Sequence, residues 1–208
     1  MNQISLKNEA LRKVFHLLLI LAPIAYFQLG KWLSLAIFAS IATIVVSLDY
    51  ARRSNPTVKT IFAKIFGIIL REHELAGDKL SGASWVALAA CINFLLFSPE
   101  IAVTSFSILV FSDAAAAIVG RKFPSRPFFE KTFNGAVAFF VVGLVVVVTC
   151  GALYHSRVWF YLFGLFALFS VTIIESRPSL LKIDDNFTIP IGFSVIMTTF
   201  DLMWNYSY

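Results

Sequence analysis

The chain has 208 residues, of which 59% are hydrophobic and only 14% are charged. A soluble domain carries about 25% charged residues, so this composition excludes an ordinary soluble enzyme and indicates a protein solvated by lipid. The net charge of +5 would suit nucleic acid, but the cations lie outside the apolar segments and almost all on one side of them, and we expect no nucleic-acid partner.

Seven apolar segments are long enough, or nearly so, to cross a membrane as helices, which takes about 17–25 residues. The third is short, and Pro190 interrupts the seventh early. The segments are residues 14–30, 32–48, 82–97, 101–119, 133–154, 158–174 and 187–204. The first is not a signal peptide, because no small-residue cleavage site follows it. The sequence therefore predicts an all-α, polytopic transmembrane helix bundle in a single membrane-embedded domain, residues 1–208.

The only long polar connection, residues 49–81, contains an apolar stripe near helical spacing. Its members are Val58, Ile61, Phe62, Ile65, Ile68 and Ile69, with Lys59 and Lys64 largely off the stripe. This pattern is typical of an amphipathic helix on the membrane surface, over about residues 57–71. A helix packed against the bundle would show the same pattern.

Lys and Arg are distributed unequally between the two sides of the seven-span arrangement. One side has only Lys31 and Arg157. The other has Lys7, Arg12, Lys13, Arg52, Arg53, Lys59, Lys64, Arg71, Lys79, Arg121, Lys122, Arg126, Lys131, Arg177 and Lys182. The positive-inside rule then predicts the N-terminus inside and the C-terminus outside.

Asp113 is the most informative acidic residue, because it lies inside the predicted span 101–119, six residues before its end. At 1.5 Å of rise per residue, that is about 9 Å below the helix end. A carboxylate at such a depth costs about 2.5–3.5 kcal/mol, so it usually faces a polar cavity and a partner. A structural ion pair with Arg121 is the alternative to a functional role.

The turn after Asp113 combines small, polar and basic residues: Gly120, Arg121, Lys131, Thr132, Asn134 and Gly135. The first N–H groups of a helix, with Lys and Arg beside them, form a ready site for an anion such as phosphate. The cations alone would also suit anchoring to lipid headgroups. The intramembrane carboxylate favours phosphate chemistry, since it can hold a divalent cation that bridges phosphate oxygens.

Further polar groups fall on the same side of the membrane. They are Arg71, Glu72, His73 and Glu74 before the third span, Glu175, Asp184, Asp185 and Asn186 before the last, and Arg12, Lys13 and His16 at the start of the first. Helix capping accounts for one of residues 184–186, but not for two adjacent acids. The chain has no phosphate-binding loop and no dinucleotide fingerprint, so a nucleotide has to be held by membrane-embedded elements.

Four motifs, in this order, resemble the CTP-dependent lipid-alcohol kinases, a family with dolichol kinase, phytol and phytyl-phosphate kinases and yeast-type diacylglycerol kinase. They are RKVFH (12–16), REHELAGDKLSGAS (71–84), SDAAAAIVGR with KTFNG (112–121 and 131–135), and IDDNFTIP (183–190). The family is distantly similar to phosphatidate cytidylyltransferases, whose long C-terminal signature this chain lacks. The chain departs from the family pattern at Ser112, usually Gly, and at Asn134, often acidic.

The resemblance implies a phosphotransferase that moves the γ-phosphoryl group of CTP to a membrane-dissolved alcohol, with Mg²⁺ as cofactor. It places catalysis on Asp113, Lys131, Arg121, Glu74 and Asp185, and Mg²⁺ binding on Asp113, Asp184 and Glu175. Nucleotide or substrate binding falls to Arg12, Lys13, His16, Arg71, Gly120, Thr132, Asn134, Gly135 and Asn186.

The stretch LREHE with LSGAS is more similar to the diacylglycerol-kinase branch, so diacylglycerol is the expected substrate, followed by phytol or another polyprenol. A phosphatidate cytidylyltransferase and a small membrane transporter are the alternatives. A transporter would show repeated halves with broken helices, and no repeat is visible. The small size and minimal loops predict a bacterial inner-membrane protein whose active site faces the cytoplasm, and self-association into a homo-oligomer stays open.

Overall fold

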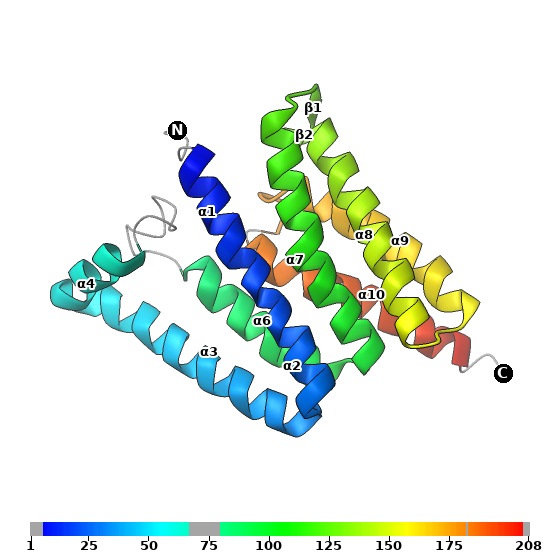
Figure 1. The fold of residues 1–208 in the computed structure, drawn as a ribbon, viewed down its shortest axis with the longest axis horizontal. Coiled ribbons are helices and arrows are strands. Elements are labelled where there is room, and N and C mark those ends of the chain that lie inside the picture. Colours follow the sequence, from blue (N-terminus) through cyan, green and yellow to red (C-terminus); the bar gives the residue numbers. More distant parts are fainter. Residues whose placement is uncertain (1–5, 67–79, 182, 206–208) are drawn as a thin grey trace.

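The computed structural model describes residues 6–66, 80–181 and 183–205 (Figure 1). Its helices are α1 (Leu6–Leu17), the 3₁₀ turn η1 (Leu18–Ile20), α2 (Leu21–Leu29), α3 (Lys31–Ser54), α4 (Pro56–Phe66), α6 (Gly82–Leu96), α7 (Pro99–Lys122), α8 (Phe133–Leu153), α9 (Val158–Glu175) and α10 (Asp185–Asn205). Two short antiparallel strands, β1 (Pro127–Phe128) and β2 (Lys131–Thr132), close the connection between α7 and α8.

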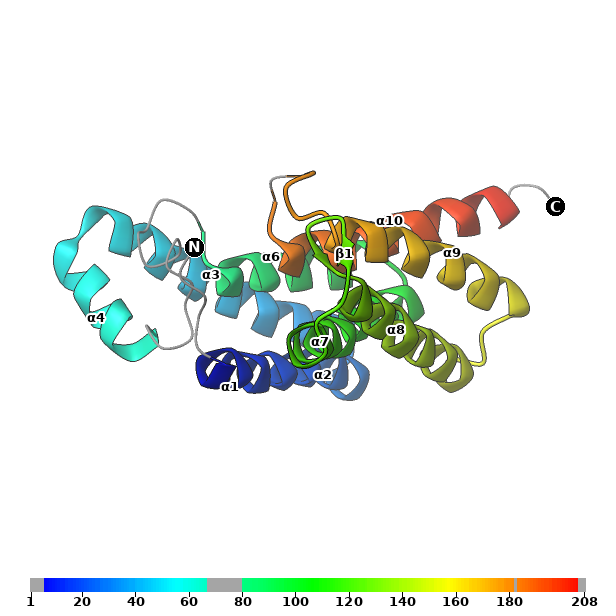
Figure 2. The same ribbon diagram turned by 90° about the horizontal axis from the view of Figure 1, so that it is seen from above.

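The predicted fold class, an all-α polytopic membrane bundle, is confirmed. Within the described residues, 6 helical segments are long and apolar enough to cross a membrane. Large apolar side chains cover the outer surface, among them Phe27, Trp32 and Leu153. Figure 2 shows α4 at one edge of the molecule and the ends of α9 and α10 at the other. The orientation of the termini and the single-domain organisation stay predictions.

The first predicted span is one rod built from α1, η1 and α2, of which Arg12–Leu29 is the membrane-spanning part. It ends at Gly30, whose φ of 76° lies in the left-handed region that glycine adopts at little cost. The chain reverses there into α3. Residues 12–16, the first family motif, form the beginning of this membrane-spanning part.

Helix α6 covers the third predicted span but is short, with 15 residues. That is about 22 Å of helix, less than the roughly 30 Å of a bilayer core. It is an inner helix in contact with α3, α7 and α10, and Ala89, Asn93 and Phe94 are completely buried. In the last turn of α6, the Lys31 ammonium donates a hydrogen bond to the carbonyl of Leu95 at 2.9 Å. This carbonyl at the helix end therefore has a hydrogen-bond partner.

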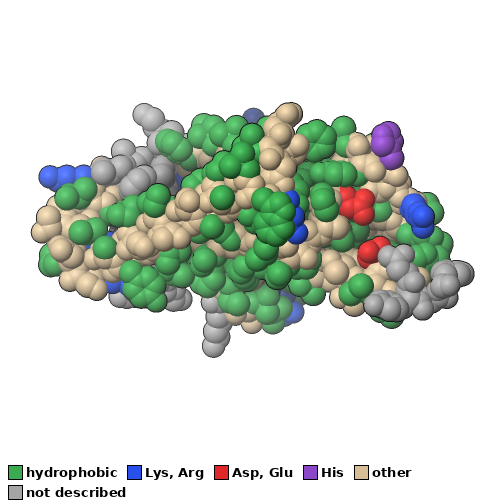
Figure 3. All heavy atoms as spheres, turned by 90° about the horizontal axis from the view of Figure 1, so that it is seen from below, with side chains coloured by type: hydrophobic (Ala, Val, Ile, Leu, Met, Phe, Trp, Pro, Cys, Tyr) green, Lys and Arg blue, Asp and Glu red, His purple; other side chains and the backbone are tan. Residues whose placement is uncertain are grey.

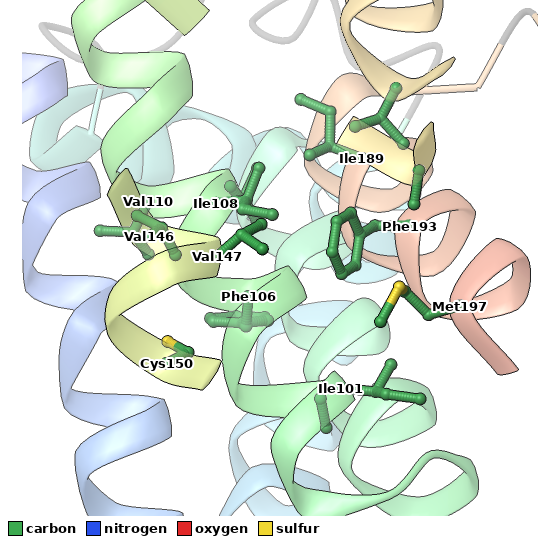
Figure 4. Close-up of a cluster of buried hydrophobic side chains, with 14 of the residues drawn as sticks. Ile101, Phe106, Ile108, Val110, Val146, Val147, Cys150, Ile189, Phe193 and Met197 are labelled. Atoms are coloured by element: carbon green, nitrogen blue, oxygen red, sulfur yellow. The ribbon is translucent and has the colours of Figure 1, made fainter. Parts of the chain in front are cut away.

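Helix α7 forms the centre of the bundle and packs against α8 and α10, as well as α1 and α6. Figure 4 shows apolar side chains of α7, α8 and α10 meeting in the core. A polar tie lies in the same core, because Asn93 Nδ2 donates to Ser105 Oγ at 2.9 Å and Ser194 Oγ donates to Asn93 Oδ1 at 2.7 Å. These bonds fix α6, α7 and α10 to one another.

Two elements differ from the sequence prediction. Helix α3 continues past residue 48 to Ser54, because Asp49 and Arg52 pair with each other and are buried instead of forming a loop. Helix α4 covers the predicted surface helix as far as Phe66, and the remainder of 57–71 lies outside the described residues. The Arg52 guanidinium lies 4.7 Å from the Phe62 ring centre, so α4 packs on α3.

Candidate active site

Asp113 is buried on α7 and forms an ion pair with Lys13 of α1, through its Oδ2 atom. His16 Nε2 lies 3.4 Å from the same oxygen and 3.0 Å from the carbonyl oxygen of Leu109. Both neighbours of Nε2 are acceptors, so this nitrogen carries the imidazole hydrogen. Arg121, considered above as the partner of a structural ion pair, is exposed at the end of α7, and the ion pair of Asp113 is made with Lys13.

Lys131 of β2 connects Asp113 to the two C-terminal helices. Its ammonium forms an ion pair with Glu175, the last residue of α9, and lies 3.7 Å from Asp185 Oδ2 at the start of α10. Burial lowers the pKa of Lys131, but the carboxylates of Glu175, Asp185 and Asp113 together raise it above its ordinary value of 10.5. The lysine is therefore a permanent cation among three carboxylates.

The turn between α7 and α8 is held by its own side chains. Thr132 Oγ1 accepts from the Gly135 amide at 3.2 Å, and Ser125 Oγ accepts from the Asn134 amide at 2.9 Å. The Asn134 side chain donates to the carbonyl of Phe123 at 3.0 Å. These backbone amides, predicted as anion ligands, thus already donate within the protein. The cationic side chains are the better candidates for holding phosphate.

Close contact of α7 and α8 requires two glycines at this turn. A Cβ atom on Gly120 would lie 2.7 Å from Thr132 Oγ1, and one on Gly135 would lie 3.1 Å from the carbonyl oxygen of Ala116. Neither position has room for a side chain. The predicted residues Gly120, Thr132 and Gly135 are therefore brought together, and they set the height of Lys131 relative to Asp113.

The other predicted site residues have different positions. Asp184 Oδ1 accepts from the Asn186 amide at 3.0 Å and from Asn186 Nδ2 at 2.7 Å, so this pair caps the start of α10. Arg12 is half-buried beside the cluster on α1. Arg71 and Glu74 lie outside the described residues.

The described residues contain no group of three or more His, Cys, Asp or Glu side chains placed to hold a metal ion. Asp113 and Glu175 each pair with a lysine instead. Mg²⁺ commonly takes one or two carboxylates together with water and phosphate oxygens. The carboxylates here fit an ion that arrives with a nucleotide and do not fit a cage made by protein alone.

A second buried charge pair lies in the C-terminal turns of α3 and was not predicted from the sequence. Asp49 Oδ2 accepts from the Ser81 amide at 2.7 Å and from Ser84 Oγ at 2.5 Å, while Arg52 Nε donates to Oδ1 at 2.5 Å. Asp49 is completely buried. An acid in the last turns of an apolar span, as at Asp113, was the available signal. Asp49 fixes the start of α6, where the motif at residues 71–84 ends.

No family model matches the chain, and no solved structure matches it. Among curated proteins, CTP-dependent diacylglycerol kinase 1 of Saccharomyces cerevisiae is 26% identical, over 92% of this chain and 73% of its own length. The protein of the same name from Eremothecium gossypii is 27% identical, over 93% of this chain and 67% of its own length. Over most of its length the chain is thus similar to two CTP-dependent diacylglycerol kinases.

This relationship confirms the family resemblance that the four motifs predict. An uncharacterized protein of Rickettsia prowazekii is also related, with 28% identity over 92% of this chain and 94% of its own length. Residues from three of the motifs, at 12–16, 112–121 with 131–135, and 183–190, lie in the Lys13–Asp113 and Lys131–Glu175 pairs and beside them. Glu175, the last residue of α9, is the member that lies outside the motifs.

Proposed function

We propose that this protein transfers the γ-phosphoryl group of CTP to the hydroxyl group of diacylglycerol, giving phosphatidate and CDP. The observation that carries the proposal is that α1, α7, β2, α9 and α10 each contribute an ionisable side chain to one largely buried cluster. We call Lys13, His16, Asp113, Lys131, Glu175 and Asp185 the charged cluster. Phosphoryl transfer needs positioning and charge neutralisation more than covalent chemistry, and this cluster supplies both.

Lys13 and Lys131 are the phosphate-binding groups of the proposal. Without nucleotide, their charges are balanced by Asp113 and Glu175. An incoming triphosphate offers each ammonium a second anionic partner and would loosen these internal pairs. Arg121, exposed at the rim of the hairpin, supplies a guanidinium for the outer phosphate oxygens.

Asp113, with Asp185 or Glu175, is the carboxylate set that would hold Mg²⁺ beside the nucleotide. When bound, the ion neutralises charge on the β- and γ-phosphate oxygens. The contacts of Asp113 with Lys13 and His16 both use its Oδ2 atom. Its other carboxylate oxygen, Oδ1, is the atom that would bind the ion.

In the proposed transfer, the lipid hydroxyl oxygen forms a bond to the γ-phosphorus, and the bond from that phosphorus to the β–γ bridging oxygen breaks. CDP leaves, and the hydroxyl proton passes to a carboxylate. Asp185, at the start of α10 and partly exposed, is the described candidate for this base. Glu74 is the other candidate.

The proposed acceptor is diacylglycerol because the two named relatives are diacylglycerol kinases. Phytol and other polyprenols carry the same primary hydroxyl on an apolar chain and are the next acceptors to test. Access from the bilayer fits an active site between membrane helices. We place the protein in a bacterial inner membrane with the charged cluster on the cytoplasmic side, where CTP is available.

The test uses purified protein in detergent with Mg²⁺ and CTP labelled at the γ-phosphate. Diacylglycerol, phytol and a polyprenol are offered separately, with Asp113→Asn as control. Label should appear in diacylglycerol and should be lost in the control. If label appeared only in phytol or only in the polyprenol, that alcohol and not diacylglycerol would be the substrate. Release of labelled pyrophosphate with phosphatidate as acceptor would instead establish a cytidylyltransferase.

A further inference from the structure

A second polar site lies at the end of the bundle opposite to the charged cluster. A cavity of about 380 Å³ opens there between the start of α7, the α8–α9 connection, the start of α9 and the end of α10. Glu100, which lines it, is 13 residues from Asp113 on α7, or about 20 Å along the helix. Its apolar lining includes the buried side chains of Ile101, Phe160 and Met197. The proposed kinase reaction uses none of these residues.

Ionisable side chains of both signs line this cavity: Glu100, Asp201, His155 and Arg157. Glu100 Oε2 accepts from Ser156 Oγ at 2.7 Å. Within the part of the chain that the structure describes, the side chains of His155, Arg157 and Asp201 have no ion pair or hydrogen bond. Their charges are therefore available to a ligand that carries both a cation and an anion.

Aromatic rings complete the lining. The ring centres of Trp159 and Trp204 are 4.0 Å apart, and those of Trp159 and Phe163 are 6.2 Å apart. Tryptophan gathers at the membrane–water boundary, and an indole face attracts an ammonium group. Figure 3, which views the molecule from this end, shows acidic side chains with a His and a Lys or Arg close by, among hydrophobic and other side chains.

The backbone at the cavity rim is held in an unusual conformation. His155 has a φ of 52°, in the left-handed region that non-glycine residues rarely adopt. Its amide donates to the carbonyl of Ala152 at 3.2 Å, and the next amide, of Ser156, donates to the carbonyl of Gly151 at 2.8 Å. These two bonds are those of a common C-terminal helix cap, in which a residue just after the helix is left-handed. The cap ends α8 and places His155 and Arg157 at the same rim of the cavity.

We propose that this cavity binds the zwitterionic headgroup of a membrane phospholipid. The carboxylates of Glu100 and Asp201 and the tryptophan faces take the ammonium group, while His155 and Arg157 take the phosphate. A metal cation would gain nothing from Arg157, and a simple anion would be repelled by the two acids. Exposed apolar side chains beside the rim, such as Leu153 and Val158, continue onto the surface where the acyl chains lie.

The test measures phospholipid retained by the purified protein in native mass spectrometry. Phosphatidylethanolamine and phosphatidylglycerol of equal chain length are offered in competition. Phosphatidylethanolamine should be retained at least about fivefold over phosphatidylglycerol. Asp201→Asn and Arg157→Gln should each reduce its retention about fivefold or more. Both residues are exposed and unpaired, so the variants should keep the wild-type melting temperature.

Lys31→Gln is the matched control, because Lys31 lies near the same end of the bundle but does not line this cavity. It should retain phosphatidylethanolamine like the wild type. Equal retention of the two lipids, or unchanged retention in Asp201→Asn, would overturn the proposal. Preference for phosphatidylglycerol would also overturn it and would indicate a site for anions only. None of these results depends on kinase activity.

Discussion

The Lys13–Asp113 pair joins two charges that are nearly removed from solvent, with side-chain exposures of 5% and 10%. Removing one partner of such a pair leaves the other charge buried without compensation. The free energy of unfolding then typically falls by about 3–5 kcal/mol. Asp113→Asn should therefore lower both the melting temperature and the kinase rate, the latter by about 100–1000-fold. Transfer of labelled phosphate and thermal unfolding in detergent measure the two effects.

A double variant separates stability from catalysis. Adding Lys13→Met to Asp113→Asn removes the unpaired ammonium, so the melting temperature should recover while the activity stays lost. Glu130→Gln is the matched control, because this exposed carboxylate of the same hairpin binds Ser179 and not the charged cluster. Recovery of activity in the double variant would show that Asp113 serves only to balance Lys13.

Lys131 yields a prediction on pH. Burial lowers its pKa, while Glu175, Asp185 and Asp113 raise it, with a net rise above 10.5. A raised pKa means that the stabilisation is fully present below the ordinary value and is lost only as pH rises through the higher, folded value. Wild-type activity should thus show no fall from Lys131 up to about pH 10.

Glu175→Gln removes the carboxylate that raises this pKa most, and burial remains. The alkaline limb of the pH–activity profile should then move to lower pH, and Lys131→Arg should restore a flat profile in the Glu175→Gln background. Profiles from about pH 7 to 10.5 provide the measurement. An alkaline limb that does not move in Glu175→Gln would contradict the assignment of Lys131 as a phosphate-binding cation.

At the scale of single residues, the sequence predicts some of the site and misses the rest for a physical reason. Asp113 is visible because an acid inside an apolar run needs a partner. Its partner is not visible, because Lys13 is 100 residues away and only packing of α1 on α7 brings them together. Asp49 shows the same limit, since three of its four bonds go to Ser81 and Ser84 across the chain.

Among the elements, the α7–α8 crossing determines the geometry of the site. Gly135→Leu would place side-chain atoms against Thr132 Oγ1 and the Ala116 carbonyl, 2.9 Å and 3.1 Å from the first added carbon. The helices would have to separate, moving Lys131 away from Asp113. We expect a loss of activity of at least about tenfold, because small misplacements at a reacting centre have large effects.

Gly192→Ala provides the control for that crossing. A Cβ atom there would meet Val171 Cγ1 at 3.5 Å, an ordinary contact, so α10 should accept it with unchanged activity. Activity assays and melting curves of the two variants, expressed in parallel, make the comparison. Full activity in Gly135→Leu would contradict the prediction, because it would show that the spacing of α7 and α8 does not determine the geometry of the charged cluster.

The elements themselves follow from the sequence wherever an apolar run is long. All seven apolar segments contain a helix, since lipid leaves backbone groups no other partner. The hairpin β1–β2 is not predictable in the same way, because its strands have two residues each and depend on contacts such as the Glu130 amide with the Ser176 carbonyl at 3.0 Å. The start of α10, with Pro190 buried inside the helix, is stabilised by Asp184 and its neighbours.

For the whole molecule, the unequal distribution of Lys and Arg predicts the orientation in the membrane. The predicted seven crossings, with α6 as the shortest, would place the two termini on opposite sides, with the N-terminus inside. Reporters fused to either end, one active in the cytoplasm and one only outside, should give opposite results. Finding both ends inside would remove one crossing, and α6, too short for an exposed span, would be the helix to reassign.

The separation of Lys13 and Asp113 also has a consequence for biosynthesis. The two residues are 100 positions apart, and a ribosome adding about 5–20 residues per second makes that stretch in about 5–20 s. Throughout this interval the first helix has emerged while its lysine lacks the carboxylate that neutralises it. We expect Lys13 to stay near the membrane surface until α7 is inserted and Asp113 can pair with it. The segment that carries Lys13 would then be fixed in place only after a segment made about 100 residues later.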